Sequence, residues 1–301
     1  MLSQLKTKYC QLMKPIIQKL PLHENSSFVA RTYKTPNFEV GWHQHIEHEL
    51  ILFTEGSGLS FVGNHVGEFE TGDIYLLGSN LPHSFRKRDP KLVTSAIVVQ
   101  FTEDFWGTAF LNLPECRHIR QLLATSIFGL KMSTETTKKL WPVIRELETA
   151  VDFRRVLLLG ECLEIISKGK GYIEVSTQDV RQLNNKDKDT IDRVFKFTIE
   201  NFKEPINLTR VADLACMSTP SFCNYFKKST KKTYIDFLNE VRTGYACTLL
   251  LDTKKSVLEI CFESGYNTMA NFHKQFIKIK KFTPLQYRKY FAGRLSSHTL
   301  G

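Results

Sequence analysis

The last third of the sequence contains the same apolar framework twice, and this duplication constrains the fold more than any other feature. The two copies occupy residues 211–226 and 258–276. Each copy has a short apolar helix pattern, a turn of a few residues, and a second helix pattern with two phenylalanines four residues apart. A lysine-rich stretch follows each copy. The arrangement predicts two helix-turn-helix units in tandem.

Positive charge is concentrated in the same part of the chain. Residues 186–301 hold 20 of the 41 Lys and Arg residues and 11 of the 31 Asp and Glu residues, so they carry +9 of the net charge of +10. A basic segment joined to a nearly neutral one is the distribution expected of a phosphate-binding domain. The alternative is a helical bundle without DNA contact, but solubilising lysines alone would not be segregated in this way. The expected partner is double-stranded DNA.

The 100° step of a helix separates the buried from the outward residues of each second helix. Phe222, Phe226, Phe272 and Phe276 are expected to face the core. The outward candidates for DNA contact are Ser218, Pro220, Ser221, Asn224, Lys227 and Lys228 in the first copy, and Asn267, Ala270, Asn271, Lys274 and Lys278 in the second. Asn is suited to adenine and Ala or Pro to a thymine methyl group, whereas Lys is suited to phosphates.

The ends and the spacing of these helices can also be predicted. Ser218 and Asn267 are expected to be the N-cap residues of the two recognition helices. Residues 234–251 predict one helix between the units, roughly 27 Å long at 1.5 Å per residue. A rigid spacer of this size would hold the recognition helices close to one DNA turn apart, about 34 Å. Gly244 inside this helix is expected to cost about 1 kcal/mol.

The first two thirds of the chain predict a different architecture. After a mixed segment at 1–27, residues 28–104 contain short alternating runs separated by glycines, which predict an antiparallel jelly roll or small barrel. Residues 105–175 have helical periodicity and are expected to form a connector and a dimer interface. The alternative is that they pack on the barrel of the same chain. Polar residues 176–186 predict a linker, so the chain is expected to be a multidomain α+β protein.

Cysteine usage and hydropathy indicate the compartment. The seven cysteines include no Cys-x-x-Cys pair, and Cys216 and Cys261 are expected to be small core residues. This usage favours a reducing, cytoplasmic setting. The N-terminal residues lack a signal-peptide core, and the longest apolar run, 156–166, is too short to cross a bilayer and contains two glutamates. No membrane partner is expected.

A histidine-rich pattern marks a candidate site in the N-terminal part. His43, His45 and Glu49 have the same parity, so on one strand they would share a face, and His83 follows later. Three imidazoles and a carboxylate would suit Zn²⁺, Fe²⁺, Mn²⁺ or Ni²⁺. The favoured interpretation is instead a barrel mouth that encloses a small ligand without a cofactor, a sugar being one candidate. Its candidate lining, which could equally be barrel core, is Trp42, His43, His45, Glu49, Phe53, Tyr75, His83 and Phe85.

Residues 187–291 resemble the DNA-binding domain of the AraC/XylS family of bacterial transcription regulators. The resemblance is carried by Ala212-x-x-Ala215-x-Met217-Ser218, Phe226-Lys-Lys, Arg242-x-x-x-Ala246-x-x-Leu249-Leu250, Ile260-x-x-x-x-Gly265-Tyr266, Phe272-x-x-x-Phe276 and Thr283-Pro284-x-x-Tyr287-Arg288. It implies a phosphate contact for Arg242. The family usually has glycine after each recognition helix, where this chain has Lys231 and Lys281. A lysine at positive φ would cost on the order of 1 kcal/mol, so a reshaped turn is one expectation.

Residues 43–56 and 72–83 are similar to the paired motifs of the cupin superfamily of small β-barrels, although in the second motif Gly78 replaces a proline and Asn80 replaces a glycine. The two resemblances together imply a sequence-specific transcription regulator that responds to a small-molecule effector. They imply a homodimer, contact with RNA polymerase if the protein is an activator, and no catalytic activity. One alternative is a metal-binding cupin enzyme with a DNA-binding appendage. Another is a ligand-independent DNA-binding protein whose barrel serves only for dimerisation.

Overall fold

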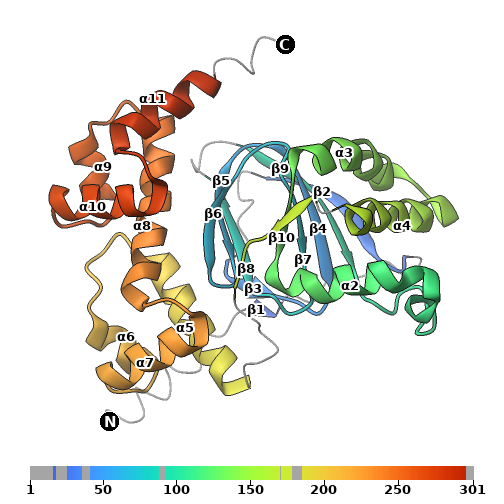
Figure 1. The fold of residues 1–301 in the computed structure, drawn as a ribbon, viewed down its shortest axis with the longest axis horizontal. Coiled ribbons are helices and arrows are strands. Elements are labelled where there is room, and N and C mark those ends of the chain that lie inside the picture. Colours follow the sequence, from blue (N-terminus) through green and yellow to red (C-terminus); the bar gives the residue numbers. More distant parts are fainter. Residues whose placement is uncertain are drawn as a thin grey trace. The chain divides into compact units, whose positions relative to one another are not determined.

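A computed structural model describes residues 16–17, 26–35, 41–87, 93–169, 171–177 and 185–295. The chain divides into two compact units, an N-terminal unit with most of residues 15–184 and a C-terminal unit with the residues from 185 onward (Figure 1). Of the segment 1–27, only residues 16–17 and 26–27 are described, so its expected mixed character lies mostly outside the described residues. No helix among the described residues is long and apolar enough to span a membrane.

The N-terminal unit is built on two sheets in which nearly all neighbouring strands are antiparallel (Figure 1). The smaller sheet has the order β1 (Ile16–Ile17), β3 (His43–Gln44), β8 (His83–Lys87), β5 (Gly58–Val62) and β6 (His65–Phe69). The larger has the order β11 (Tyr172–Glu174), β10 (Leu130–Met132), β7 (Ile74–Leu77), β4 (His48–Glu55), β9 (Thr94–Phe101) and β2 (Val29–Thr35). The predicted antiparallel sheet domain is therefore confirmed.

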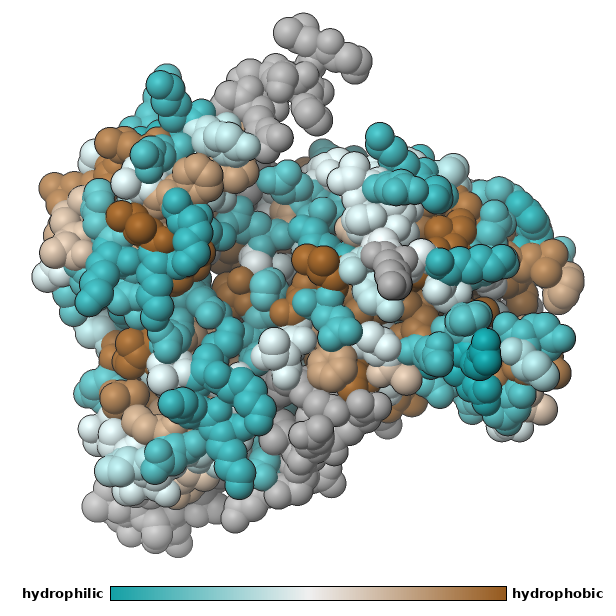
Figure 2. Space-filling view, viewed as in Figure 1, coloured by the Kyte–Doolittle hydropathy of each residue, from teal (hydrophilic) through white to brown (hydrophobic). Residues whose placement is uncertain are grey.

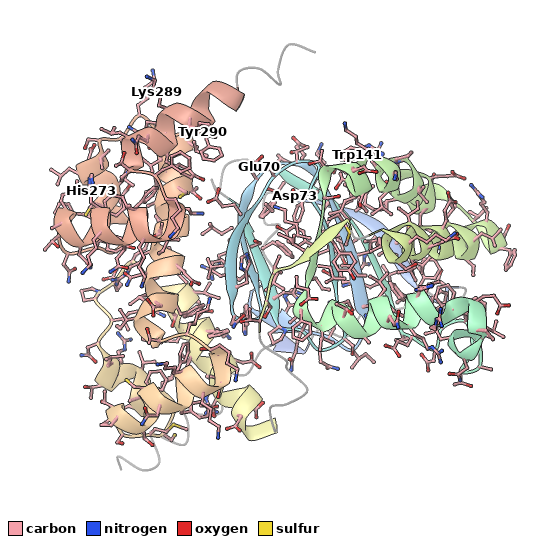
Figure 3. The ribbon with its side chains drawn as sticks, viewed as in Figure 1. Glu70, Asp73, Trp141, His273, Lys289 and Tyr290 are labelled. Atoms are coloured by element: carbon pink, nitrogen blue, oxygen red, sulfur yellow. The ribbon has the colours of Figure 1, made fainter. Side chains whose placement is uncertain are left out.

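Short turns hold these strands in register. Glu70 and Asp73 lie in the turn before β7 (Figure 3), where the Glu70 amide donates to the Asp73 carboxylate at 2.9 Å. Asp73 also pairs with Lys131 of β10 at 2.6 Å. The turn is thereby fixed to the neighbouring strand of the larger sheet.

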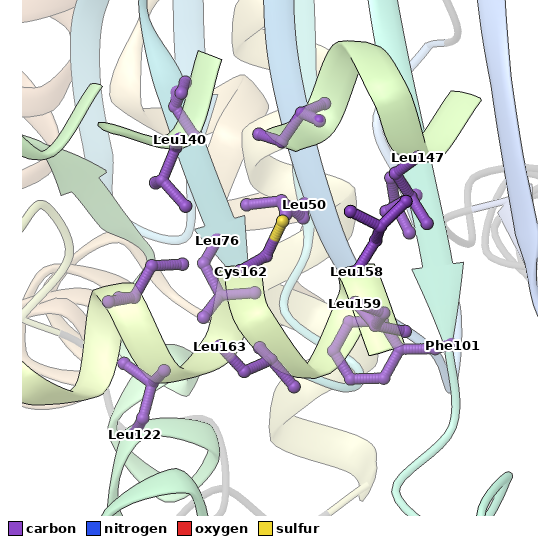
Figure 4. Close-up of a cluster of buried hydrophobic side chains, with 14 of the residues drawn as sticks. Leu50, Leu76, Phe101, Leu122, Leu140, Leu147, Leu158, Leu159, Cys162 and Leu163 are labelled. Carbon is purple, nitrogen blue, oxygen red and sulfur yellow. The ribbon is translucent and has the colours of Figure 1, made fainter. Parts of the chain in front are cut away.

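Helices cover the outer face of the larger sheet (Figure 1). They are α2 (Arg117–Thr125), α3 (Thr134–Thr149) and α4 (Asp152–Lys168), with short 3-10 turns η1 (Phe110–Asn112), η2 (Pro114–Cys116) and η3 (Ser126–Phe128). Leu140 and Leu147 of α3 and Leu158 and Leu163 of α4 are fully buried in one cluster with residues of β4, β7 and β9 (Figure 4). The inner faces of these helices thus pack on the sheet of the same chain, and the expected dimer interface in 105–175 stays a prediction.

The expected linker, 176–186, is shorter in the structure. Ser176 is 2% exposed, and its amide donates to the Phe128 carbonyl at 2.8 Å, so it belongs to the N-terminal unit. Helix α5 (Asn185–Asn201) already begins at the other end of the predicted linker. The polar composition did not reveal that side-chain hydrogen bonds fasten its first residues.

The C-terminal unit consists of helices and contains the two predicted helix-turn-helix units (Figure 1). After α5 come α6 (Leu208–Leu214), α7 (Thr219–Thr230), α8 (Tyr234–Asp252), α9 (Val257–Glu263), α10 (Met269–Lys280) and α11 (Pro284–Leu295). Helices α6 and α7 form the first unit, and α9 and α10 form the second. Helix α8 joins them, which confirms the helix predicted at 234–251.

The two units differ by one residue in their turns. Ser218 caps α7 as predicted, with its hydroxyl accepting from the Ser221 amide. The cap of α10 is Thr268 and not Asn267, because Thr268 accepts from the Asn271 amide. The prediction for Asn267 was wrong because the second turn is one residue longer than the first.

The turn of the first unit also corrects the expectation for Cys216. This residue is exposed and has φ of 56°, so it occupies a left-handed turn position and not the core. Gly265, with φ of 81°, takes the corresponding position in the second unit. Cys261 is buried, as expected.

Lys231 and Lys281 end the two recognition helices in the left-handed conformation, with φ of 62° and 61°. The turns are therefore not reshaped, and each lysine bears the conformational cost. We expect Lys231→Gly and Lys281→Gly each to raise the free energy of unfolding by about 0.5–1 kcal/mol. Urea unfolding of the full chain would measure this. Lys228→Gly, inside α7, is the matched control and should lower stability by about 1 kcal/mol. Equal destabilisation by Lys231→Gly and Lys228→Gly would contradict the strain argument.

Candidate functional site

The outward surface of α7 and α10 is arranged as the helical step predicted. Phe222, Phe226, Phe272 and Phe276 are fully buried. The predicted contact residues are all exposed, namely Ser218, Pro220, Ser221, Asn224, Lys227, Lys228, Asn267, Ala270, Asn271, Lys274 and Lys278. Exposure makes these side chains available to DNA but does not test their individual roles.

Aromatic packing fixes the orientation of both recognition helices. The Phe226 ring lies 5.5 Å from that of Tyr234 and 5.9 Å from that of Phe195. In the second unit, the Phe272 ring lies 5.2 Å from that of Tyr266. Large buried rings have few ways to repack, so the outward face of each helix is held by the core beneath it.

Polar contacts orient or hold two side chains on the outward face of α10. Gln275 donates to the Asn271 amide oxygen at 3.4 Å, which orients the Asn271 side chain. Lys278 pairs with Asp236 of α8 at 2.7 Å, and hydrogen bonds from Lys278 and Thr233 lower the pKa of Asp236. A phosphate would therefore compete with Asp236 for Lys278.

The structure does not support the expected phosphate contact of Arg242. Its Nε donates to the Phe202 carbonyl at 2.8 Å, and its Nη2 donates to the Glu204 carbonyl at 3.0 Å. The guanidinium thus fastens the chain after α5 to α8. The motif match indicated that Arg242 has a specific partner. It could not show whether that partner lies in the same chain or on DNA.

The exposed surface of the C-terminal unit extends beyond the recognition helices. Lys289 and Tyr290 of α11 were not chosen by sequence reasoning, nor was His273, which is half-buried on α10 (Figure 3). Lys289 is exposed, and Tyr290 is 49% exposed and stacks on Phe282 at 5.5 Å between ring centroids. Hydrophilic residues cover much of the visible face of this unit, with small apolar patches between them (Figure 2). Lys289 is an additional cation available to a phosphate.

Four side chains of the N-terminal unit converge between its two sheets. His43 and His83 are paired across β3 and β8, His45 follows β3, and Glu49 lies on β4 of the other sheet. One nitrogen from each of the three histidines lies within 4.8 Å of the others. Glu49 Oε2 lies 2.8 Å from His45 Nε2, and Glu49 Oε1 lies 3.5 Å from His83 Nε2. All four side chains are buried.

This convergence corrects the expectation of one shared strand face. Strand β3 ends at Gln44 and β4 begins at His48, and the chain crosses from one sheet to the other between them. His43 and Glu49 therefore approach from opposite sheets. Their proximity results from the packing of the two sheets and not from the equal parity of their sequence numbers.

Backbone carbonyls orient the three imidazoles. Nδ1 of His43 lies 2.9 Å from the Gly41 carbonyl, that of His45 3.1 Å from the Glu47 carbonyl, and that of His83 2.8 Å from the Leu81 carbonyl. A carbonyl oxygen can only accept, so each Nδ1 carries a proton. The Nε2 atoms of neutral imidazoles would then present their lone pairs inward, an arrangement found where histidines bind metals.

The charges of the cluster are strongly coupled. Burial, together with the neighbouring His83, lowers the pKa of His43 to about 3, so this ring is neutral. Burial also opposes charge on His45, but the hydrogen bond with Glu49 outweighs it and raises the pKa of His45. The pKa of Glu49 is well below its usual value despite burial, because His45 and His83 stabilise the carboxylate. His83 Nε2 is buried, and apart from its 3.5 Å approach to Glu49 Oε1 it has no hydrogen-bond partner among the described residues.

Gln100 is a member of the cluster that sequence reasoning missed. It lies opposite Glu49 in the β4–β9 register, and its Nε2 donates to Glu49 Oε2. Its Oε1 is buried without a hydrogen-bond partner among the described residues. The sequence feature that could have indicated Gln100 is its position as a single amide side chain in the otherwise mostly apolar run 93–101.

The aromatic pocket candidates fill the core instead of lining an open mouth. The Phe53 ring lies 5.1 Å from that of Phe85 and 6.1 Å from that of Tyr75. Phe69, which was not predicted, stacks on Phe53 at 4.1 Å. Trp42 is also buried. Phe53, Tyr75 and Phe85 therefore fit the alternative of barrel core, and the polar cluster is the candidate site.

Asn80 explains one departure from the second cupin-like motif. It has φ of 57°, a conformation that glycine adopts freely and asparagine tolerates. Its amide donates to the His45 carbonyl at 2.7 Å. Asn80 thus takes the conformation of the usual glycine and holds the loop that carries His45.

A separate cavity of about 450 Å³ lies among the helices of the N-terminal unit. It is lined by His118, Gln121, Leu122, Ala124, Thr125, Ser167 and Tyr172. None of the predicted ligand-site residues contributes to it. Its lining comes from α2, the end of α4, and β11.

Comparison with known proteins identifies both units. Residues 25–99 match the family described as the AraC-like ligand binding domain, and residues 211–290 match a helix-turn-helix domain family. The chain belongs to the AraC family of transcription regulators. As a member of that family, it is a sequence-specific DNA-binding transcription regulator with a ligand-binding domain, and its partners are DNA and a small-molecule effector.

Similar proteins cover the chain to different extents. The HTH-type transcriptional activator RhaR of Mannheimia succiniciproducens is 23% identical over 281 residues, which span 89% of this chain and 93% of that protein. The melibiose operon regulatory protein of Escherichia coli K12 is 25% identical over 99 residues, 33% of each chain. The structure of ToxT from Vibrio cholerae has 13% identity and a TM-score of 0.36, covering 87% of this chain and 98% of ToxT.

The two recognition-helix asparagines give a test of DNA reading by this AraC-family protein. We expect Asn224→Ala or Asn271→Ala to relax base preference at one position by about 1–3 kcal/mol. Lys227→Ala should instead weaken binding to all sequences alike and lower the salt slope by about 0.9. Affinities for DNA selected from a random library, with single-base variants, would distinguish the two. Equal loss on selected and random DNA for the asparagine variants would contradict the predicted orientation of the helices.

Proposed function

We propose that this AraC-family regulator binds DNA through α7 and α10 in response to a ligand held at the cluster of His43, His45, His83 and Glu49. The convergence of the three imidazoles with a carboxylate in the protein interior carries this proposal. Burying four such groups at one point is costly unless they are paired or bind a ligand. A regulatory role is favoured over catalysis because the named relatives are transcription regulators.

A divalent metal ion is one occupant that a specific observation favours. Each Nδ1 is held by a carbonyl, and His83 Nε2 makes no hydrogen bond among the described residues beyond its 3.5 Å approach to Glu49 Oε1, which fits a set of inward-facing nitrogen ligands. The three Nε2 atoms and the Glu49 carboxylate would hold the ion. When bound, the ion would supply positive charge and a coordination position for an oxygen of an effector. His45 would release its proton on binding.

A sugar is a candidate class for the organic effector. One relative is named for the melibiose operon, which supports this class without specifying the compound. Sugar hydroxyl groups could bind a metal ion or hydrogen-bond to Gln100 and Glu49. The aromatic residues Phe53, Tyr75 and Phe85 do not contribute to this argument, because they pack against one another.

We propose a homodimer formed through the outer face of α4. Val151 and Phe153 are each 69% exposed and Leu157 is 50% exposed, and together they make an apolar stripe at the start of this helix. The stripe is separate from the face that packs on the larger sheet. If the protein is an activator, as the relative RhaR is named, RNA polymerase is a further partner. Binding to DNA in a bacterium also supports a cytoplasmic location.

The dimer proposal gives a direct prediction. Phe153→Asp should weaken self-association by about tenfold or more, because two copies of a desolvated aromatic ring would be replaced by two like charges. Analytical ultracentrifugation across a concentration series would measure the dissociation constant. Lys139→Ala, at an exposed position of α3, is the control and should leave association unchanged. A monomeric wild-type protein at all concentrations would contradict the proposal.

The proposed function can be tested by retention of genomic DNA. The purified protein would be incubated with sheared DNA of its own genome, with and without Zn²⁺ and with a panel of sugars. We expect enrichment upstream of a few operons, with a dependence on one of these ligands. Enrichment that is the same in all conditions would favour a ligand-independent regulator. Absence of enrichment from a folded protein in every condition would contradict the proposal.

A further inference from the structure

Asn64 occupies an unusual position in the turn between β5 and β6. Turn residues at a hairpin tip are ordinarily exposed, but Asn64 is 1% exposed. Gly63 beside it has φ of 53°, and a Cβ on Gly63 would lie 2.5 Å from Ser176 Oγ. The turn is therefore packed directly against the last described residues of the N-terminal unit.

The Asn64 side chain binds these residues through both ends of its amide. Its Oδ1 accepts from Ser176 Oγ at 2.9 Å and from the Thr177 amide at 3.0 Å. Its Nδ2 donates to Thr177 Oγ1 at 2.9 Å. From Thr177 the chain continues through residues 178–184 to α5, the first helix of the C-terminal unit. Asn64 therefore fastens the last described residues before the segment that leads to α5.

The same turn is connected to the histidine cluster by the backbone. Val62 and His83 are register partners across β5 and β8, and the Gly63 amide donates to the Pro82 carbonyl at 2.8 Å. His83 in turn donates from Nδ1 to the Leu81 carbonyl. A movement of His83 toward a ligand would therefore act on residues 81–83 and, through two adjacent backbone contacts, on Gly63 and Asn64.

Close packing leaves little space to absorb such a movement. A Cβ on Gly129 would lie 2.5 Å from the Val62 side chain and 3.0 Å from that of Val175. The Val175 amide also donates to the Gly129 carbonyl at 2.9 Å. Well-packed elements transmit small shifts because they cannot deform continuously.

We propose that Asn64 is the positioning residue through which the state of the histidine cluster reaches Ser176 and Thr177, and thereby the segment that leads to the DNA-binding unit. This inference rests on the proposed function, in which the cluster holds a ligand. Asn64 is buried and is not a member of the cluster. Its role is to hold residues 176–177 in a position that depends on His83.

Two variants test this coupling on the full chain. Asn64→Ala removes the amide, and Thr177→Val removes only the hydroxyl that accepts from Nδ2. Thr177 is exposed, so this second variant should fold normally. Thr71→Val, on a different turn where Thr71 donates to the Gly56 carbonyl, is the matched control. The probe is Zn²⁺ alone, and the DNA is the sequence that the wild-type protein selects from a random library.

The first readout is the effect of Zn²⁺ on the DNA dissociation constant, and the second is amide hydrogen exchange of residues 172–177. In the wild type and Thr71→Val, we expect Zn²⁺ to change the dissociation constant by at least about fivefold and to change the exchange rate of this segment. In Asn64→Ala and Thr177→Val, Zn²⁺ should still bind, but the change in the dissociation constant should fall below about twofold. If Asn64 only stabilised residues 176–177, its replacement would lower the stability of the protein but leave the effect of Zn²⁺ on the DNA dissociation constant unchanged.

The outcomes separate the inference from the proposed function. If Zn²⁺ binds and the two variants respond as the wild type does, the role of Asn64 is overturned and the ligand site is retained. If Zn²⁺ does not bind, the metal proposal fails. In that case the substitution His83→Gln is used in place of a ligand to perturb the cluster. The coupling would be supported if His83→Gln changes the amide hydrogen exchange of residues 172–177 in the otherwise wild-type protein but not in the Thr177→Val protein. Unchanged exchange in both backgrounds would overturn it.

Discussion

Replacing Gly265 by alanine is expected to lower the free energy of unfolding of the protein by about 2–4 kcal/mol. Gly265 has φ of 81°, which an alanine adopts only with strain. The added Cβ would also lie 2.3 Å from the Phe202 carbonyl oxygen and 2.9 Å from Arg242 Nε. These two atoms are hydrogen-bonded to one another at 2.8 Å, so neither can move without losing the contact. Urea unfolding of the full chain, followed by circular dichroism, would measure the loss.

The first helix-turn-helix unit provides a matched control for this prediction. Cys216 takes the corresponding left-handed position, with φ of 56°, but its side chain is exposed. Cys216→Ala should therefore change stability by less than about 0.5 kcal/mol. A loss for Gly265→Ala no larger than that for Cys216→Ala would show that the contact with Phe202 and Arg242 does not constrain the turn.

His83→Ala is expected to weaken Zn²⁺ binding by about 100-fold or more. Loss of an outer-shell partner of a metal ligand typically costs about 10- to 100-fold in affinity, and His83 would contribute a direct ligand. The substitution also removes the buried Nε2 that has no hydrogen-bond partner among the described residues. Competition with a chromophoric chelator would give the affinity, and elemental analysis of the dialysed protein would give the stoichiometry.

The control for this prediction is His118→Ala, because His118 is exposed on α2 and lies outside the cluster. Circular dichroism would verify that both variants are folded. Equal Zn²⁺ stoichiometry and affinity for wild type, His83→Ala and His118→Ala would contradict a metal site at the cluster. The small-ligand interpretation of the N-terminal unit would then be the one to pursue.

The DNA-binding unit of the protein was predictable because its periodicities are local. Phenylalanines four residues apart identify a buried helix face, and their outward neighbours follow from the helical step. The spacer helix and the cap at Ser218 could be predicted for the same reason. The cap at Thr268 could not, since a one-residue difference in turn length has no periodic signature.

Residues whose partners lie far along the chain were less predictable. The match of Arg242 to a family motif indicated importance but not its use of the Phe202 and Glu204 carbonyls. The predicted pocket aromatics proved to be core residues, because alternation along a strand does not tell whether the enclosed space is filled. Gln100 was missed because its role depends on its register with Glu49.

The sequence by itself determined that this protein has two helix-turn-helix units, a basic C-terminal unit and a histidine-rich sheet domain. These properties depend on composition and on spacings of a few residues. Only the tertiary structure decided which polar groups meet: His43 and Glu49 from opposite sheets, and Asn64 with Ser176, 112 residues apart. Such pairs form because the packing of two sheets fixes their distance, and no local spacing in the chain records that packing.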